Sequence, residues 1–170
     1  MKILGITLLL ISSILLTACD KTKRASTHSA TAPSPIDIKL SIEGSFKKMM
    51  NAAFEQNEEI YFSFIDNDNY IGMDDFGQII ETTKVLKQQF IQNKKVIDSY
   101  ELFEFDRIVT KPLSNTIVLV LAQVRVEITT ITNQPLAFFG GYTQIWQLQQ
   151  GHWKVISSSS TLRPVNKVDE

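Results

Sequence analysis

The stretch from Thr116 to Ile131 restricts the possible folds more than any other part of this sequence. It is rich in β-branched residues, and every second residue from 118 to 128 is apolar, which predicts one long β-strand. One face is apolar without a break: Val118, Val120, Ala122, Val124, Val126 and Ile128. The other face begins with Ile117, Leu119 and Leu121 and becomes polar from Gln123. A strand with one wholly apolar face needs a second layer over that face, so we expect a sheet covered on one side and partly exposed on the other.

Three further strands are predicted around this one. They run over 96–109, 138–149 and 153–162, with turns at Asn133-Gln134-Pro135 and Gln150-Gly151-His152. Gly140-Gly141 within the third predicted strand indicates a bulge or a sharp bend of the sheet.

Two helices are predicted ahead of the strands. From Ile36 onward, apolar residues recur at spacings of three and four, as Ile38, Ile42, Phe46, Met49, Met50, Ala53 and Phe54. Gly44 interrupts this stripe at a cost of about 1 kcal/mol relative to alanine. A second helix is expected from Thr82 or Thr83 to Asn93. Helices followed by a curved antiparallel sheet predict an α+β cone, in which the sheet wraps around the long N-terminal helix.

The segment from Glu58 to Asp75 carries an acidic, amide-rich run between aromatic residues. An EF-hand loop beginning at Asp66 would need an oxygen ligand at its fifth position, Gly at its sixth and Glu at its twelfth, but Tyr70, Ile71 and Gly77 stand there. A turn in which Asx side chains bond nearby backbone groups is the better prediction. No metal site and no cofactor are predicted.

The first nineteen residues resemble a bacterial lipoprotein signal. Lys2 precedes an apolar run that ends in Leu16-Thr17-Ala18-Cys19, which matches the lipobox pattern. The resemblance implies diacylation of the Cys19 sulfur, cleavage before it, and acylation of the new amine, with palmitate among the acyl chains. The alternatives are a transmembrane helix, for which the run is short, and an ordinary secretory signal, which would leave an unpaired exported cysteine.

These features divide the chain into a signal peptide (1–18), a lipidated cysteine with a flexible tether (19–36), a folded domain (37–164) and a short tail (165–170). Asp20 resembles the signal that keeps lipoproteins of enterobacteria in the inner membrane. We therefore expect the periplasmic face of that membrane, with the outer membrane as the alternative. The processed chain has 16 basic and 18 acidic residues, which argues against nucleic acid as a partner.

Two motifs carry a resemblance to the SnoaL-like branch of the nuclear transport factor 2-like superfamily. They are Tyr70-Ile71-Gly72-Met73-Asp74 and the C-terminal stretch from Gly141 to Ile156, with its Gly151-His152-Trp153-Lys154-Val155-Ile156 ending. The resemblance implies a cystatin-like, cone-shaped domain. Enzymes of this superfamily hold an acid/base pair inside the cone. Here the first helix has no Tyr or His on its stripe, the apolar face of 116–131 has no acid, and Met73 replaces the usual Thr.

Several polar residues are expected to face the interior of such a cone. Asp66 and Asp74 are the candidate catalytic carboxylates, Tyr70, Tyr142 and Trp146 the candidate ligand-binding residues, and Ser158 a weaker candidate. For each of them, a capping or packing role is the alternative that the residue type favours.

Three functional hypotheses follow from these residues. The first is a membrane-anchored, non-enzymatic module that binds a small apolar ligand or another protein. It includes a homodimer formed through the outer sheet face, where Ile117, Leu119, Leu121 and Phe138-Phe139 would supply an apolar patch. The second is an enzyme that moves a proton on a small apolar molecule, which requires Asp66 or Asp74 in a closed cavity with a raised pKa. The third is a lipoprotein that inhibits a toxin or assists envelope assembly.

Overall fold

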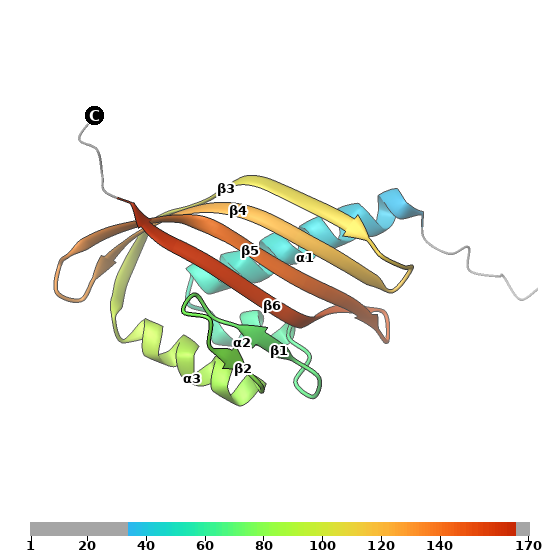
Figure 1. The fold of residues 1–170 in the computed structure, drawn as a ribbon, viewed down its shortest axis with the longest axis horizontal. Coiled ribbons are helices and arrows are strands. Elements are labelled where there is room, and N and C mark those ends of the chain that lie inside the picture. The colour runs from blue at the N-terminus through green and yellow to red at the C-terminus, as the bar shows by residue number, and fades with distance from the viewer. Residues whose placement is uncertain (1–33, 166–170) are drawn as a thin grey trace, which may run out of the picture. The chain divides into compact units, whose positions relative to one another are not determined.

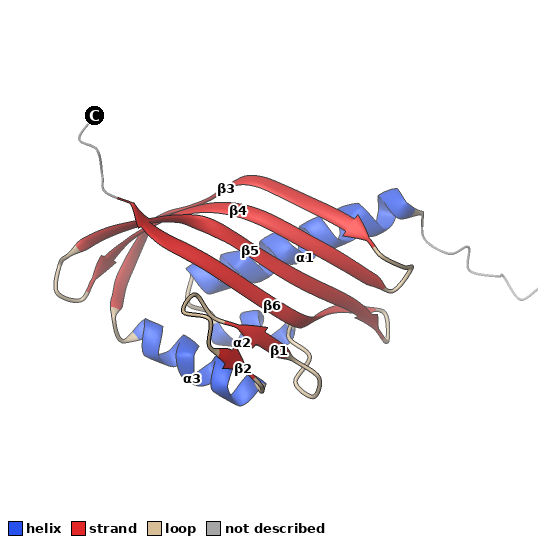
Figure 2. Cartoon of the chain, viewed as in Figure 1, coloured by secondary structure: helices blue, strands red, loops and turns tan. Residues whose placement is uncertain are grey.

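The computed structural model describes residues 34–165. The predicted signal peptide and Cys19 lie outside the described residues. The elements are α1 (Pro35–Phe54), α2 (Glu58–Ser63), β1 (Ile71–Met73), β2 (Ile79–Ile80), α3 (Thr83–Lys94), β3 (Ile97–Pro112), β4 (Ile117–Thr130), β5 (Pro135–Gln149) and β6 (His152–Val165). Figures 1 and 2 show a curved sheet with α1 lying across one of its faces. The predicted α+β class is confirmed.

Helix α1 begins where its capping residues dictate. Ser34 is the N-cap, its hydroxyl accepts from the backbone N–H of Asp37, and the Asp37 carboxylate accepts from the backbone N–H of Ser34. This reciprocal pair, with Pro35 in the first turn, satisfies N–H groups that have no partner inside the helix. The helix continues through Gly44 without interruption. Its buried stripe contains Ala52 in place of the expected Ala53.

Six strands form one sheet in the order β2-β1-β6-β5-β4-β3. Strands β3 to β6 are successive antiparallel neighbours, whereas β1 joins the edge of β6 in a parallel pairing. The face of β4 predicted to be apolar is buried along its whole length, and the opposite face is exposed or half-buried. The alternation seen in the sequence therefore gives the orientation of this strand correctly.

Strand β5 has no bulge at its glycine pair. Gly140 and Gly141 stay in register with β4 and β6, while the shift in the β5–β6 pairing lies between Ile145 and Trp146. A Cβ atom added to Gly140 would lie 1.7 Å from the backbone oxygen of Thr161. The predicted bulge is therefore absent at these glycines, where the backbone of β6 instead approaches Gly140 closely.

The core lies between α1 and the inner face of the sheet. The Phe46 and Phe105 rings are 5.2 Å apart, and the Phe54 and Tyr100 rings are 5.4 Å apart. α1 consequently runs antiparallel to β3. A second apolar cluster at the other end of the inner face contains Val124, Val126 and Ile128, packed against half-buried side chains that include Phe138 and Leu162.

The segment between α1 and α3 contains short elements that the sequence did not reveal. Asn57 caps α2, and the three-residue strand β1 pairs with both β2 and β6. The predicted Asx turn is present, because Asp66 accepts from the backbone N–H groups of Asp68 and Asn69. α3 starts after its N-cap Thr82, as expected. No helix within residues 34–165 is both long and apolar enough to cross a lipid bilayer.

Candidate functional site

The interior of the cone holds a buried pair of polar side chains on β5. Trp146 is fully buried and its indole N–H donates to Oε1 of Gln144 at 2.9 Å, while Gln144 is itself only 3% exposed. The Phe64 ring lies edge-on to the indole, 6.0 Å away. The Trp146 N–H is thus already engaged by a side chain within the protein.

Tyr70 makes the second interior polar contact. Its ring is 3% exposed and its hydroxyl lies 2.7 Å from the Ser158 hydroxyl on β6. A Cβ atom on Gly72 would come within 2.5 Å of the same hydroxyl oxygen. Glycine at this position therefore leaves room for the Tyr70 hydroxyl. Ser158 is the register partner of Gln144, so the two polar contacts sit beside each other on the inner face.

The four tyrosines of the chain all lie on the inner side of the sheet or in the helical layer that covers it, packed against one of the two apolar clusters. Burial raises the pKa of Tyr61, with smaller contributions from Tyr70, Tyr142 and Tyr100. Burial also raises the pKa of Tyr142, and the negative charge of Asp75 adds to that effect. These phenols stay protonated around neutral pH, so they are suited to donating a hydrogen bond and unsuited to acting as bases.

Asp66 is a buried carboxylate that the surrounding turn fully engages. It accepts from the backbone N–H groups of Asp68 and Asn69, from the Asn69 amide at 3.0 Å and from the Gln149 amide at 2.6 Å. Burial by itself would raise the pKa of Asp66, but these hydrogen bonds outweigh it and hold the pKa below its usual value. A general base for proton abstraction needs the opposite shift, so the arrangement is that of a structural link between this turn and the end of β5.

We expect Asp66→Asn to lower the free energy of unfolding at pH 7 by about 1–3 kcal/mol, because an amide cannot accept all of these bonds. A carboxyl group whose pKa is depressed by folding stabilises the protein above its unfolded pKa, near 4, and loses that contribution as the pH falls through the folded pKa. Urea unfolding between pH 7 and pH 3 should therefore show the two chains converging. A stability difference that stays constant with pH would contradict this account.

Asp74 closes the β1–β2 hairpin. Its Oδ1 accepts from the backbone N–H groups of Phe76 and Gln78, and its Oδ2 accepts from the Gln89 amide on α3 at 3.2 Å. The neighbouring Asp75 accepts from the backbone N–H of Leu162, near the end of β6. Both carboxylates therefore hold the hairpin against α3 and β6, and the structure does not bring Asp74 together with Asp66 in one site.

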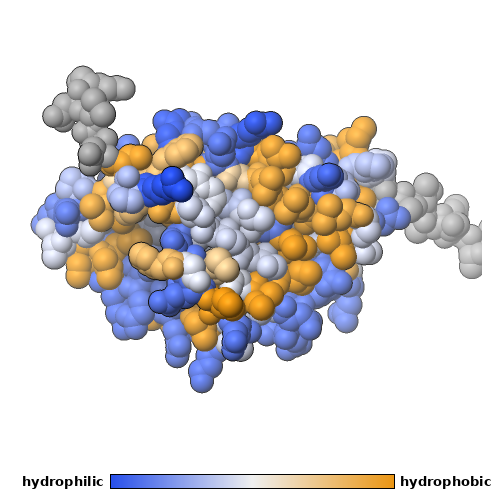
Figure 3. Space-filling view, in the orientation of Figure 1, coloured by the Kyte–Doolittle hydropathy of each residue, from blue (hydrophilic) through white to orange (hydrophobic). Residues whose placement is uncertain are grey.

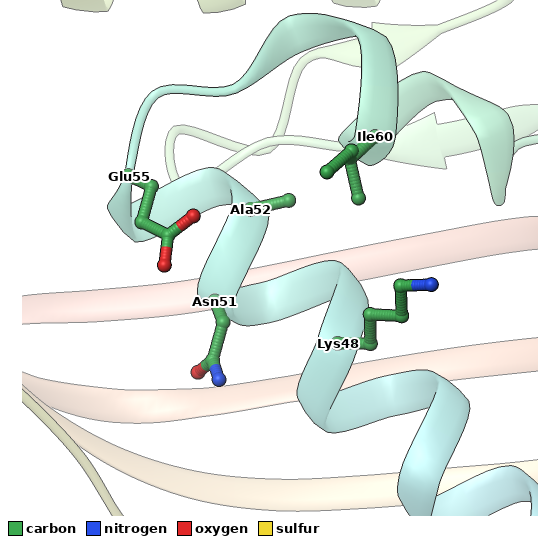
Figure 4. Close-up of a pocket in the computed structure, with 5 residues that line it drawn as sticks. All are labelled: Lys48, Asn51, Ala52, Glu55 and Ile60. Atoms are coloured by element: carbon green, nitrogen blue, oxygen red, sulfur yellow. The ribbon is translucent and has the colours of Figure 1, made fainter.

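Two open grooves lie on the helical side, and none of the candidate residues Asp66, Asp74, Tyr70, Tyr142 or Trp146 lines either of them. One, of about 380 Å³, is lined by Lys48, Asn51, Ala52, Glu55 and Ile60. Figure 4 shows Ile60 of α2 above Ala52 of α1, with Glu55 to their left and Lys48 and Asn51 below them. The second, of about 220 Å³, lies between α1, the end of α2 and the β5–β6 turn. Within residues 34–165, no group of three or more His, Cys, Asp or Glu side chains is placed to bind a metal ion.

The outer face of the sheet carries a surface that crosses all six strands. Register partners on neighbouring strands point to the same face of a sheet. Following the register from β3 to β2 defines what we call the outer band: Val109, Lys111, Leu119, Leu121, Thr143, Ile145, Ser157, Ser159, Met73, Ile71 and Ile79. Its members are small or apolar apart from one lysine, so the band offers a surface without ion pairs.

Figure 3 views this face directly. Apolar residues gather over β3, β4 and β5 and again over β1 and β2, with less hydrophobic residues between them. The exposed fractions of Leu121, Ile71 and Ile79 are 42%, 53% and 63%. Beyond the band, the same face becomes polar, and Arg125 forms 2.9 Å ion pairs with Glu104 and Asp106.

The structure changes the membership of the patch expected from the sequence. Phe139 is 42% exposed, but Phe138 pairs with the buried Val126 and packs on the inner face. Adjacent residues of a strand point to opposite faces, so the two phenylalanines cannot share one patch. Ile71, Met73 and Ile79 were missed, because the pairing of β1 with β6 leaves no local signal in the sequence.

No protein-family model matches this sequence, and no curated protein matches it. Similarity is found among solved structures. A hexachlorocyclohexane dehydrochlorinase of the LinA-type3 class from Novosphingobium barchaimii superposes with a TM-score of 0.66 at 11% identity, over 78% of this chain and 93% of that chain. An NTF2-like protein from Cytophaga hutchinsonii gives 0.56 at 19% identity, over 77% and 100%.

An NTF2-like protein of unknown function in nutrient uptake from Rhodospirillum rubrum gives a TM-score of 0.61 at 11% identity, over 72% of this chain and 98% of that chain. At such identities the likeness concerns the fold alone, and this fold is found both in enzymes and in binding proteins. The folded part of this chain has the nuclear transport factor 2-like fold.

Proposed function

We propose that the protein is a membrane-anchored lipoprotein of the cell envelope whose folded domain works by protein interaction, pairing with a second copy through the outer band. The lipobox ending at Cys19 supports the anchoring. The outer band, which runs without an ion pair across six strands, is the observation that supports the interaction.

The interior supports interaction over catalysis. The Trp146 N–H is bonded to Gln144, and the Tyr70 hydroxyl is bonded to Ser158. The Asp66 carboxylate is held by hydrogen bonds from its turn and from Gln149, which lower its pKa. All three groups already have hydrogen-bond partners inside the protein. A proton-transfer enzyme would need at least one of them within hydrogen-bond distance of a substrate.

The outer band has properties that a face-to-face dimer requires. Leu119, Leu121 and Ile145 lie on adjacent strands, as register partners or two residues apart, and form an apolar centre. Beside this centre, Thr143 and the β6 serines Ser157 and Ser159 have small side chains, so the surface there is recessed and can accommodate larger side chains of a partner. An apolar centre surrounded by polar residues such as Arg125 and Glu104 is typical of protein interfaces.

We expect the chain beginning at Asp20 to sediment as a dimer, and Leu119→Lys with Leu121→Lys to weaken its association at least 100-fold. Charges placed opposite each other in an apolar interface cost several kcal/mol, and each 1.4 kcal/mol changes the dissociation constant tenfold. Sedimentation velocity over a range of concentrations measures the effect, with circular dichroism to check folding.

The matched control is Val96→Lys with Ile131→Lys. Both positions are exposed, at 54% and 62%, and lie at the ends of β3 and β4 outside the outer band. This pair should leave the dimer intact. A monomeric unaltered chain, or a dimer that resists the charges at Leu119 and Leu121, would refute pairing through the band.

A further inference from the structure

Three exposed apolar side chains lie at one end of the domain. Ile36 and Leu40 are one helical turn apart on α1 and are 70% and 64% exposed. Leu113, in the turn between β3 and β4, is 56% exposed. We call these three residues the end patch.

Packing elsewhere in the domain brings these two elements to the same end. α1 runs antiparallel to β3, since Phe54 packs on Tyr100 near the start of β3 and Thr110 donates to Glu43 at 3.4 Å near its end. The first turns of α1 therefore lie beside the β3–β4 turn. Figure 1 shows the beginning of α1 and this turn together at the right of the view.

The preceding chain joins the domain at this end. Ser34 caps α1, so the segment that carries Cys19 enters beside the end patch. Fourteen residues separate Cys19 from Ser34, and a fully extended segment of that length spans at most about 50 Å. An acylated Cys19 keeps the domain within that distance of the bilayer but does not by itself determine which surface faces the lipid.

We infer that the end patch rests on the lipid surface and orients the domain with the start of α1 toward the membrane. This inference rests on the lipid anchor of the proposed function. Apolar side chains held close to a bilayer by a tether partition into its interfacial region. In this orientation the lipid contacts one end of the sheet and not its outer face, so the outer band remains accessible to a second copy.

Helix α3 is the competing membrane-facing surface, because it is basic and carries the exposed Val85. It lies at the other end of α1, where Lys94 donates to the carbonyl of Gln56. Another of its cations, Lys87, is engaged by Glu58 and by the Phe62 ring. The segment that carries Cys19 enters the domain at Ser34, next to the end patch. This position favours the end patch over α3 as the surface that faces the membrane.

The test uses the full lipidated chain in vesicles of phosphatidylethanolamine and phosphatidylglycerol. Cys19 is the only cysteine in the sequence, so an introduced cysteine provides the one free thiol once Cys19 is acylated. Leu113→Cys, Ile131→Cys and Val85→Cys are each labelled with an environment-sensitive fluorophore, and quenching by spin-labelled lipid is measured. Ile131 is the matched control, since it is similarly exposed and lies in the turn at the opposite end of β4.

Quenching at position 113 should exceed quenching at position 131 at least threefold, and Ile36→Ser with Leu40→Ser should remove most of the difference. Equal quenching at 113 and 131, or stronger quenching at 85, in a chain that sediments with the vesicles overturns the orientation alone. A chain whose mass shows an unmodified Cys19 and that fails to sediment overturns the anchoring itself, and the orientation falls with it.

Discussion

Gly140→Ala should lower the free energy of unfolding by about 3 kcal/mol or more, at the upper end of the cost of overpacking a protein interior. The added Cβ would lie 1.7 Å from the backbone oxygen of Thr161. A backbone atom cannot rotate away as a side chain does, so β5 and β6 would have to separate where Gly140 pairs with Leu162. Urea unfolding followed by circular dichroism measures the loss.

Gly44 provides the control for this substitution. It lies within α1, and an added Cβ there would have no atom within 4 Å. Gly44→Ala should therefore raise the stability by about 0.5–1 kcal/mol, because alanine restricts the unfolded chain and favours the helix. If the two substitutions changed stability by similar amounts, the close approach of β6 to Gly140 would not be the cause.

Trp146→Ala should cost about 3–5 kcal/mol, the range for removing a large buried aromatic side chain. Trp146 is fully buried between β5 and the helical layer, and its loss would leave a cavity beside Phe64. It would also leave the buried Gln144 oxygen without its donor. Thermal and urea unfolding of the chain beginning at Asp20 should both report the loss.

A second set of variants separates the cavity from the lost hydrogen bond. Trp146→Phe keeps much of the side-chain volume but removes the N–H donor. The unpaired Gln144 oxygen should then lower the free energy of unfolding by about 1–3 kcal/mol. Combining Trp146→Phe with Gln144→Leu removes the acceptor as well, so the double variant should be more stable than Trp146→Phe alone. Strictly additive losses would mean that the hydrogen bond does not couple the two side chains.

The carboxylates lead to a functional conclusion. Asp66 and Asp74 stand in the segment where a superfamily resemblance directs attention, yet each closes a turn. The outward-facing surface of the same sheet holds the outer band. This arrangement is the one expected if, as we propose, the domain works through its outer face.

The sequence alone determined the regular part of this fold. The alternation in 116–131 gave β4 and its buried face, and the spacing of three and four gave α1. Ser34 and Thr82 marked where the two long helices begin, although only the latter was anticipated as a cap. These features are local, because periodicity and capping depend on residues a few positions apart.

Only the tertiary structure decided how distant segments meet. Tyr70 and Ser158 are separated by 88 positions, and the parallel pairing that joins them involves a strand too short to show any periodicity. The same pairing extends the outer band to Ile71 and Met73, and the antiparallel path of α1 brings its first turns to the end of the domain that holds the β3–β4 turn. Such contacts depend on sheet register and on the close approach of β6 to Gly140, and both are set by packing across the whole domain rather than by neighbouring residues.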